Sequence, residues 1–310
     1  MRVFLNDYER VARQQELKVG GMLMEVRESK RLKRAERLIE NLVMPSRPDV
    51  LLEAMRTQTG FAPDLLAMTS VIRADMALSA AVLQAANTQL SGWKRKLISI
   101  EGSVALLGME KVRSIVAEQF LSAALVGQDG PLQTVRLRGV ETAQTAARLA
   151  RELPQIAPHF LNGYLPSMAP DEAYAAGLLH DCGLVAMLRG FSDYAEFCQE
   201  MRTTRGYELV LAENERFGTN HCLTGFLMLK AWRLPALFCQ SIRMHHQVDD
   251  FNRPGRKVLG RKYLVLRAIL HLSASVCSAV ERESQTVEEK IAAFLGMEPD
   301  RLKRLRDGEQ

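Results

Sequence analysis

Apolar side chains recur along this chain with the spacing of α-helices over most of its length. Residues 7–42 carry one apolar stripe at helical spacing, surrounded by mainly basic positions. The stripe consists of Leu32, Ala35, Leu38, Ile39 and Leu42. Further amphipathic stretches follow from residue 63 onward, and none alternates apolar and polar residues for long enough to indicate a strand. The pattern predicts an all-α protein.

Proline and glycine breaks divide the helical pattern into parts. Pro45 to Pro48 ends the first long helix, and Gly127 to Pro131 interrupts the apolar pattern again. We therefore expect two packed helical subdomains with short extensions. The expected parts are an N-terminal helical arm at 1–41, a first helical half at 42–127, a second helical half at 131–281 and a C-terminal helical tail at 282–310.

Four local features are predicted from residue chemistry. Asp75 is expected to cap the helix that starts at Met76, since a carboxylate accepts hydrogen bonds from the free amides of a first turn. Asn87 and Gly108 are expected to end helices as C-caps, because both residue types tolerate left-handed backbone. One helix is expected from Asp171 to Leu188.

Composition and cysteine usage restrict the class of protein. Of 310 residues 47% are hydrophobic and 25% are charged, which suits one large or two modest cores. Five cysteines without CxxC spacing predict reduced thiols. No stretch has the apolar length of a signal peptide or a membrane span. We expect a cytoplasmic protein without a membrane span.

The net charge of +5 is concentrated in one stretch that contains no acidic residue. Its basic residues are Arg253, Arg256, Lys257, Arg261, Lys262 and Arg267. Arg256, Lys257, Arg261 and Lys262 are candidates to bind phosphate or an acidic partner, and the alternative is a solvated loop. No aromatic stacking platform accompanies them, so nucleic-acid binding ranks last.

The chemistry of the chain centres on the adjacent pair His180 and Asp181, which are ligand types of a hydrolytic metal site. No histidine precedes His159, and no carboxylate follows His271 until Glu281. An upstream imidazole and a downstream acidic ligand therefore have no obvious source. The sequence predicts a metal-hydrolase scaffold with an incomplete site.

Several motifs in order resemble the HDOD proteins, a bacterial regulatory branch related to the HD-domain metal-dependent phosphohydrolases. The resemblance covers about residues 42–250. In the first half it rests on Ile72 to Leu78, Val82 to Thr88 and Ile98 to Gly108; in the second half it rests on Ala176 to Gly183, Glu213 to Gly225, Trp232 to Pro235 and Ile242 to His246. The resemblance implies that the second half is an HD-domain-like helical bundle.

This chain departs from the catalytic relatives at two ligand positions. The stretch Val135 to Ala143 lacks the opening histidine that the resemblance would place there, and Ser273 to Ser275 lacks the closing aspartate. His245 and His246 are followed by Gln247, so the signature of the cyclic-di-GMP phosphodiesterase relatives is also absent. These departures favour a site without catalysis.

Five candidate ligands remain, and three interpretations are open for them. They are His180, Asp181, His221, His245 and His246. They form a structural hydrogen-bond network, hold a divalent metal without hydrolysis, or hydrolyse a phosphoester with Asp181 as the essential carboxylate. Adjacent helical residues point about 100° apart, so His245 and His246 are expected to share an ion only at a helix end. We expect no cofactor, with a divalent metal as the alternative.

Two functions follow from these observations. The resemblance implies a non-catalytic signal-transduction module that binds a protein partner, with a nucleotide as a further ligand. The alternative is a metal-dependent phosphohydrolase acting on a nucleotide or cyclic dinucleotide, with the 253–267 stretch gripping phosphate. The sequence leaves the oligomeric state open.

Overall fold

Every regular element in the part of the chain that the computed structural model describes is a helix. The described residues are 27–40, 42, 65–90, 96–124, 130–163, 165–202, 204, 206–247, 260–277, 285–297 and 300. Residues 27–39 are helical, and the labelled helices are α3 (Leu65–Arg73), α4 (Met76–Gln89), α5 (Ile100–Ala124), α6 (Gly130–Ile156), α7 (Pro158–Leu161), α8 (Pro170–Leu179), α9 (Cys182–Gly190), α10 (Tyr194–Glu200), α11 (Gly206–Phe217), α12 (His221–Ala231), α13 (Ala236–Arg243), α14 (Gly260–Cys277) and α15 (Gln285–Leu295). No strand occurs among the described residues, which confirms the predicted all-α class.

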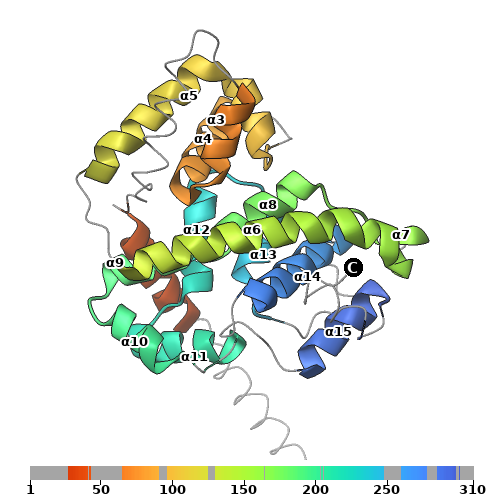
Figure 1. Ribbon diagram of the computed structural model, residues 1–310. Coiled ribbons are helices and arrows are strands. Elements are labelled where there is room, and N and C mark those ends of the chain that lie inside the picture. The colour runs from red at the N-terminus through yellow and green to blue at the C-terminus, as the bar shows by residue number, and fades with distance from the viewer. Residues whose placement is uncertain are drawn as a thin grey trace, which may run out of the picture.

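The helices form two groups, which Figure 1 shows one above the other. α3, α4 and α5 pack together in the upper group, while the long helix α6 crosses the molecule below them. α8 and α14 pack on α6, and α12 packs on α9 and α13. The expected division of the chain into halves stays a prediction, because residues 125–129 and 278–284 lie outside the described part.

Small residues let α6 and α8 approach closely in the centre of the second group. A Cβ atom at Gly177 of α8 would lie 2.7 Å from the Cα of Ala143 on α6. Buried alanines continue the seam on both helices, including Ala146 and Ala176. Close backbone approach fills the space without large side chains, and it places the end of α8 against the middle of α6.

Polar contacts of Arg73 at the end of α3 join the two groups. The Tyr174 hydroxyl of α8 donates to the Arg73 carbonyl at 2.9 Å, and the Arg73 guanidinium lies 3.9 Å from the centre of the Tyr174 ring. The same guanidinium pairs with Asp171 at 3.1 Å and with Glu101 of α5. One side chain therefore ties α3, α5 and α8 together.

The predicted local features of the first group are confirmed at two positions and wrong at one. Asp75 caps α4, since its carboxylate accepts from the Leu78 amide at 2.9 Å. Gly108 has φ +72° and breaks α5 into two helical runs. Asn87 is not a C-cap: it is buried within α4, donates to the Leu97 carbonyl and accepts from the Leu97 amide. Its side chain thus anchors the segment before α5.

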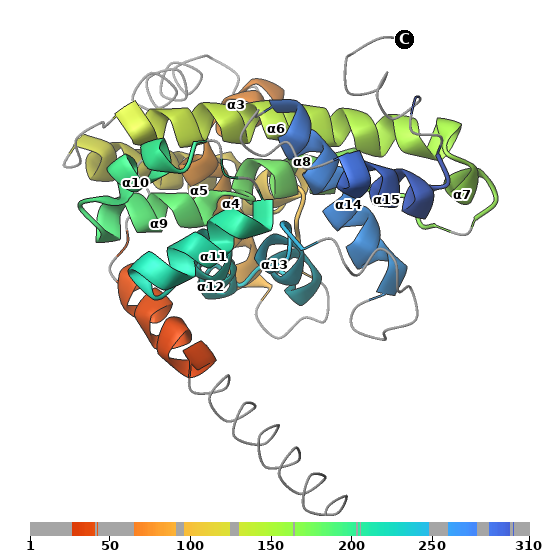
Figure 2. The ribbon, with the colours of Figure 1, turned by 90° about the horizontal axis from the view of Figure 1, so that it is seen from below.

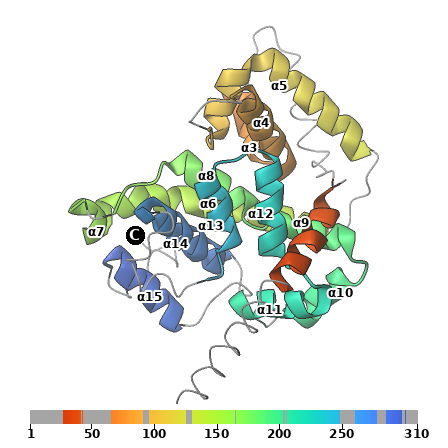
Figure 3. The same cartoon turned by 180° about the vertical axis from the view of Figure 1, so that it is seen from behind.

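The predicted N-terminal helix is confirmed over residues 27–39; it ends before residues 40 and 42, which are not helical, and residues 7–26 and 41 lie outside the described part. Its apolar stripe packs on the core, with Ala35 fully buried. Arg34 lies over the Phe191 ring at 5.2 Å, and Glu28 pairs with Arg243 at the end of α13 at 2.5 Å. Figures 2 and 3 show this helix beside α9 on the outside of the second group. The described part of the arm therefore packs on its own chain.

No single helix in the described ranges combines the length and apolarity needed to cross a bilayer. α3 and α4 reach those values only as a pair, and they meet at an angle of 118°. The five cysteines, Cys182, Cys198, Cys222, Cys239 and Cys277, are free thiols.

Candidate functional site

His180 and Asp181 lie at a break between two helices, so the single helix expected from Asp171 to Leu188 is wrong. α8 ends at Leu179, and the backbone at Asp181 (φ −102°, ψ 15°) interrupts the helix before α9 begins. His180 Nδ1 donates to the Gly177 carbonyl at 2.6 Å, and its Nε2 lies 3.3 Å from Asp181 Oδ2. Both side chains are buried.

Arg138 of α6 forms an ion pair with the carboxylate of Asp181. Its Nη2 donates to Asp181 Oδ2 at 2.6 Å, and the Asp181 side chain is only 3% exposed. Burial raises the pKa of Asp181, but the His180 ring and the Arg138 guanidinium outweigh burial and hold this pKa well below its usual range. Arg138 lies in the stretch from Val135 to Ala143 where the sequence lacks the expected histidine. Sequence reasoning noted the missing ligand but did not predict the cation.

Replacing Arg138 by methionine should lower stability in a pH-dependent way. A depressed carboxyl pKa contributes stability above its unfolded-state value, near 4, and the contribution is lost as the pH falls through the folded-state pKa. We therefore expect Arg138→Met to lower the free energy of unfolding by about 2 kcal/mol at neutral pH. The difference in free energy of unfolding between wild type and Arg138→Met should become smaller below about pH 4.

Denaturant unfolding at a series of pH values measures this gap. Arg151→Met, on the exposed face of the same helix, is the matched control and should leave the free energy of unfolding within about 0.5 kcal/mol of wild type. A gap for Arg138→Met that is the same at neutral and at acid pH would contradict the ion pair as its cause.

A second buried pair, Glu213 and His221, lies beside the first. Glu213 of α11 is fully buried and accepts from His221 Nδ1 at 2.7 Å and from the His221 amide at 3.1 Å. The Tyr194 hydroxyl donates to the same carboxylate. Burial lowers the pKa of His221, but Cys222 and Glu213 outweigh it and raise this pKa well above its usual value. The carboxylate therefore fixes the ring so that Nε2 faces away from it.

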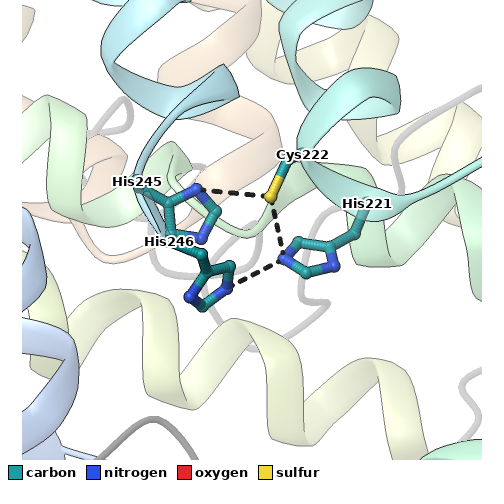
Figure 4. A group of neighbouring side chains, drawn as sticks. All are labelled: His221, Cys222, His245 and His246. Carbon is teal, nitrogen blue, oxygen red and sulfur yellow. Dashed lines mark hydrogen bonds between the residues drawn. The ribbon is translucent and has the colours of Figure 1, made fainter. Parts of the chain in front are cut away.

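His221 belongs to a compact cluster of four side chains, drawn in Figure 4, and contributes its Nε2 atom to it. The cluster consists of His221, Cys222, His245 and His246, all buried. His221 Nε2 lies 3.3 Å from Cys222 Sγ and 3.1 Å from His246 Nε2, and His245 Nδ1 lies 3.7 Å from the same sulfur. Asn220 caps α12 by accepting from the Leu223 amide at 2.8 Å, so His221 and Cys222 form the first turn of that helix.

His245 and His246 can face the same point because they lie in the turn that follows α13. The helix ends at Arg243, and the ring centres of the two histidines are 4.0 Å apart. The geometric objection to a shared ion therefore does not apply here. Cys222 was missed by sequence reasoning, since a lone cysteine after a histidine carries no recognisable spacing signal.

The charge states within the cluster differ from those of free side chains. Burial raises the pKa of the Cys222 thiol, but His221 and His245 outweigh burial and lower it to about 7. Burial and the neighbouring rings of His245 and His221 lower the pKa of His246 well below its usual value. These shifts favour the thiolate of Cys222, the charged form of His221 and the neutral form of His246.

The five predicted ligands thus form two adjacent sets, His180 with Asp181 and His221 with His245 and His246. The two sets are in contact through His245. The His245 ring lies 5.6 Å from that of His180, and His245 Nε2 lies 3.7 Å from Asp181 Oδ1. A metal held as in the catalytic HD relatives would need the Asp181 carboxylate, which already accepts from Arg138. On α14, Ser273 and Ser275 are buried and neutral. The residues present do not fit an HD-type catalytic ion.

A pocket of about 320 Å³ opens onto the cluster. The helical segment 27–39, α11, the start of α12 and the end of α13 form its walls. Its lining residues are Glu28, Arg31, Tyr207, Val210, Asn214, Asn220, Cys222, Leu223, Arg243, Met244, His246 and Gln247. Cys222 and His246 therefore face both the cluster and the pocket.

Of the four predicted phosphate-binding residues, Arg261 and Lys262 belong to the described part of the chain, and neither lines this pocket. Arg256 and Lys257 lie outside the described residues. Arg261 is exposed at the start of α14, and Lys262 pairs with Glu172 of α8 at 2.7 Å. Arg267, from the same basic stretch, is fully buried and donates to the Gln247 carbonyl. Binding of phosphate or a partner by these residues stays a prediction.

Comparison with known proteins identifies the family. Residues 44–248 match the sequence profile of the HDOD domain. An uncharacterized protein of Treponema pallidum (strain Nichols) is 21% identical over 205 residues, which are 66% of this chain but only 38% of that protein. The chain therefore spans well under half the length of this curated relative.

Two solved structures share the fold at low sequence identity. The MmoQ response regulator of Methylococcus capsulatus str. Bath has a TM-score of 0.61 and 22% identity, over 84% of this chain and 97% of that one. A virulence factor of Campylobacter jejuni subsp. jejuni has a TM-score of 0.57 and 18% identity, over 87% and 96%. Since the profile match spans more than half of its 310 residues, the chain belongs to the HDOD domain family.

Proposed function

We propose that this chain is a non-catalytic regulatory module of signal transduction that acts by binding a protein partner. The observation that carries the proposal is the ion pair between Arg138 and Asp181 at 2.6 Å. A hydrolytic metal needs the carboxylate as a ligand, and a guanidinium that satisfies the carboxylate removes both the ligand and the need for a cation. One relative of similar fold is a response regulator, which supports a signalling role.

Exposed apolar side chains on α11 support a protein partner. Tyr207 and Leu211 lie one helical turn apart and are 46% and 50% exposed. Large exposed apolar groups on one face are characteristic of protein contacts. Tyr207 also lines the pocket, whose Arg31 and Arg243 would suit a nucleotide phosphate as a further ligand. We place this activity in the cytoplasm, since all five cysteines are free thiols.

A turnover assay with a matched partner assay tests the proposal. Wild type and Asp181→Ala, each with manganese, should hydrolyse a chromogenic phosphodiester and a cyclic dinucleotide at the same background rate, because wild type lacks a catalytic ion. A protein that copurifies with wild type should be lost with Leu211→Glu and retained with Leu137→Glu, which alters a comparably exposed leucine on α6.

Turnover by wild type that Asp181→Ala abolishes would overturn the proposal in favour of a metal-dependent phosphohydrolase acting on a nucleotide or cyclic dinucleotide. Circular dichroism of the Asp181→Ala protein shows that the comparison is made between folded chains. Equal loss of the copurifying protein in the Leu211→Glu and Leu137→Glu variants would contradict α11 as the surface that contacts the partner.

A further inference from the structure

We propose that His221, Cys222, His245 and His246 together bind one divalent transition-metal ion of the zinc class. This site differs from the catalytic HD type, because His180 and Asp181 are not ligands and a cysteine sulfur is. It goes beyond the proposed regulatory function and does not depend on it.

The geometry of the four ligand atoms suits a tetrahedral ion. All four atoms lie within 4.8 Å of one another. Zinc binds histidine nitrogen at about 2.0–2.1 Å and cysteine sulfur at about 2.3 Å, so neighbouring ligand atoms of a tetrahedral site are about 3.3–3.7 Å apart. The recorded separations are 3.1 Å between His221 and His246, 3.3 Å between His221 and Cys222, and 3.7 Å between His245 and Cys222. Small side-chain movements would complete the site.

The group behind His221 orients this histidine as in known metal sites, whereas His245 must exchange its present hydrogen bond to bind. A metal-binding histidine usually donates its other ring N–H to a carboxylate or carbonyl. His221 Nδ1 donates to Glu213 at 2.7 Å, which leaves Nε2 facing the cluster. His245 would bind through Nδ1, which now donates to the Ile242 carbonyl at 2.6 Å, and its proton would then reside on Nε2, which faces Asp181 Oδ1 at 3.7 Å.

The chemistry of the four ligands selects the class of metal. A thiolate with three imidazoles favours zinc and related borderline ions over magnesium or calcium, which prefer oxygen. Cysteine binds such ions as the thiolate, and Cys222 Sγ lies 3.3 Å from His221 Nε2 and 3.7 Å from His245 Nδ1. Four protein ligands complete the coordination of zinc, which is typical of a structural site and leaves no position for a reactive water.

The pocket gives the ion a route to the cluster. Cys222 and His246 lie on its wall, so an ion can reach them from solvent although both side chains are buried. A bound ion would join the first turn of α12 to the turn after α13. These two segments form part of the pocket wall, to which α11 also contributes. Metal occupancy would therefore rigidify the pocket beside the proposed partner surface.

Titration with cobalt tests the site on the full chain, purified without a metal-binding tag and treated with a chelator. Cobalt replaces zinc in tetrahedral sites and reports a bound thiolate by a charge-transfer band. We expect a charge-transfer band and tetrahedral d–d bands that saturate at one cobalt per chain and are displaced by zinc. Absence of the charge-transfer band in wild type would overturn the proposal, whatever the variants do.

Three variants separate the proposed ligands from their neighbours. Cys222→Ser should remove the charge-transfer band and weaken cobalt binding by at least the roughly 10–100-fold that loss of a group behind a ligand costs. Cys239→Ser, which alters a buried cysteine of α13 outside the cluster, should keep the band. Asp181→Ala should keep the band but weaken cobalt binding, because Asp181 faces His245 Nε2 without being a ligand. Loss of the band at saturating cobalt in a folded Asp181→Ala protein would overturn the ligand set. If Cys222→Ser fails to fold, His246→Gln replaces it and should weaken binding with the band retained.

Discussion

Replacing Gly183 by alanine should lower the free energy of unfolding by about 3 kcal/mol or more, because α9 and α12 cross there at backbone contact. An added Cβ would lie 2.6 Å from the Gly225 amide nitrogen and 2.8 Å from the His221 carbonyl carbon, and closer still to the His221 oxygen. These are backbone atoms, so no side chain can rotate to relieve the overlap. The helices would have to separate at the first turn of α12, which also carries His221 and Cys222.

Gly102→Ala is the matched control for this substitution. Gly102 lies in the first turn of α5, where an added Cβ would meet its nearest atoms at 3.5–3.7 Å, an ordinary contact distance. Alanine is a better helix former than glycine, so this variant should be unchanged or more stable by about 0.5–1 kcal/mol. Urea unfolding of both variants measures the difference. Equal stability of Gly183→Ala and wild type would contradict the close crossing of α9 and α12.

The overall fold was predictable because helical periodicity is a local property of the sequence. The stripe around Ala35 and the cap at Asp75 depend on residues a few positions apart, and both are present as expected. Asn87 shows the limit of this approach. Its amide could have capped a helix end, but the helix continues and the side chain satisfies the backbone of Leu97, ten residues away.

The candidate site was predictable only in its residue types. His180, Asp181, His221, His245 and His246 were all expected to matter, and all are buried in one region. Arg138 could not be assigned to Asp181, because 43 residues separate them and only the crossing of α6 with the α8–α9 break brings them together. The joining of Cys222 to three histidines likewise depends on where α13 ends relative to the start of α12.

The contact between α11 and α12 orients His221 in the site, which residue types alone do not indicate. The Glu213 carboxylate holds His221 through both its ring and its amide. Without this contact the first turn of α12 would keep its Asn220 cap but lose the fixed direction of the His221 ring. The stability of the buried cluster should therefore depend strongly on Glu213.

Replacing Glu213 by alanine should lower the free energy of unfolding by about 3–5 kcal/mol, the range found when one partner of a buried charge pair is removed. The change leaves His221 without its carboxylate and leaves the Tyr194 hydroxyl without its acceptor, and both side chains are buried. Glu215→Ala is the matched control, since Glu215 lies on the exposed face of the same helix, and it should change stability by less than about 0.5 kcal/mol.

Urea unfolding of the two variants decides whether the carboxylate or the helix propensity of α11 is responsible. Both substitutions introduce alanine for glutamate in α11, so any effect of propensity is nearly the same for the two proteins. A loss of stability confined to Glu213→Ala would therefore come from the buried pair with His221.

Similar small losses of stability in both variants would show that the pair contributes little net stability, as happens when the cost of burying two charges cancels their attraction. In that case the pair would still orient the His221 ring, and cobalt binding by Glu213→Ala, weakened by roughly 10–100-fold, would measure that role separately.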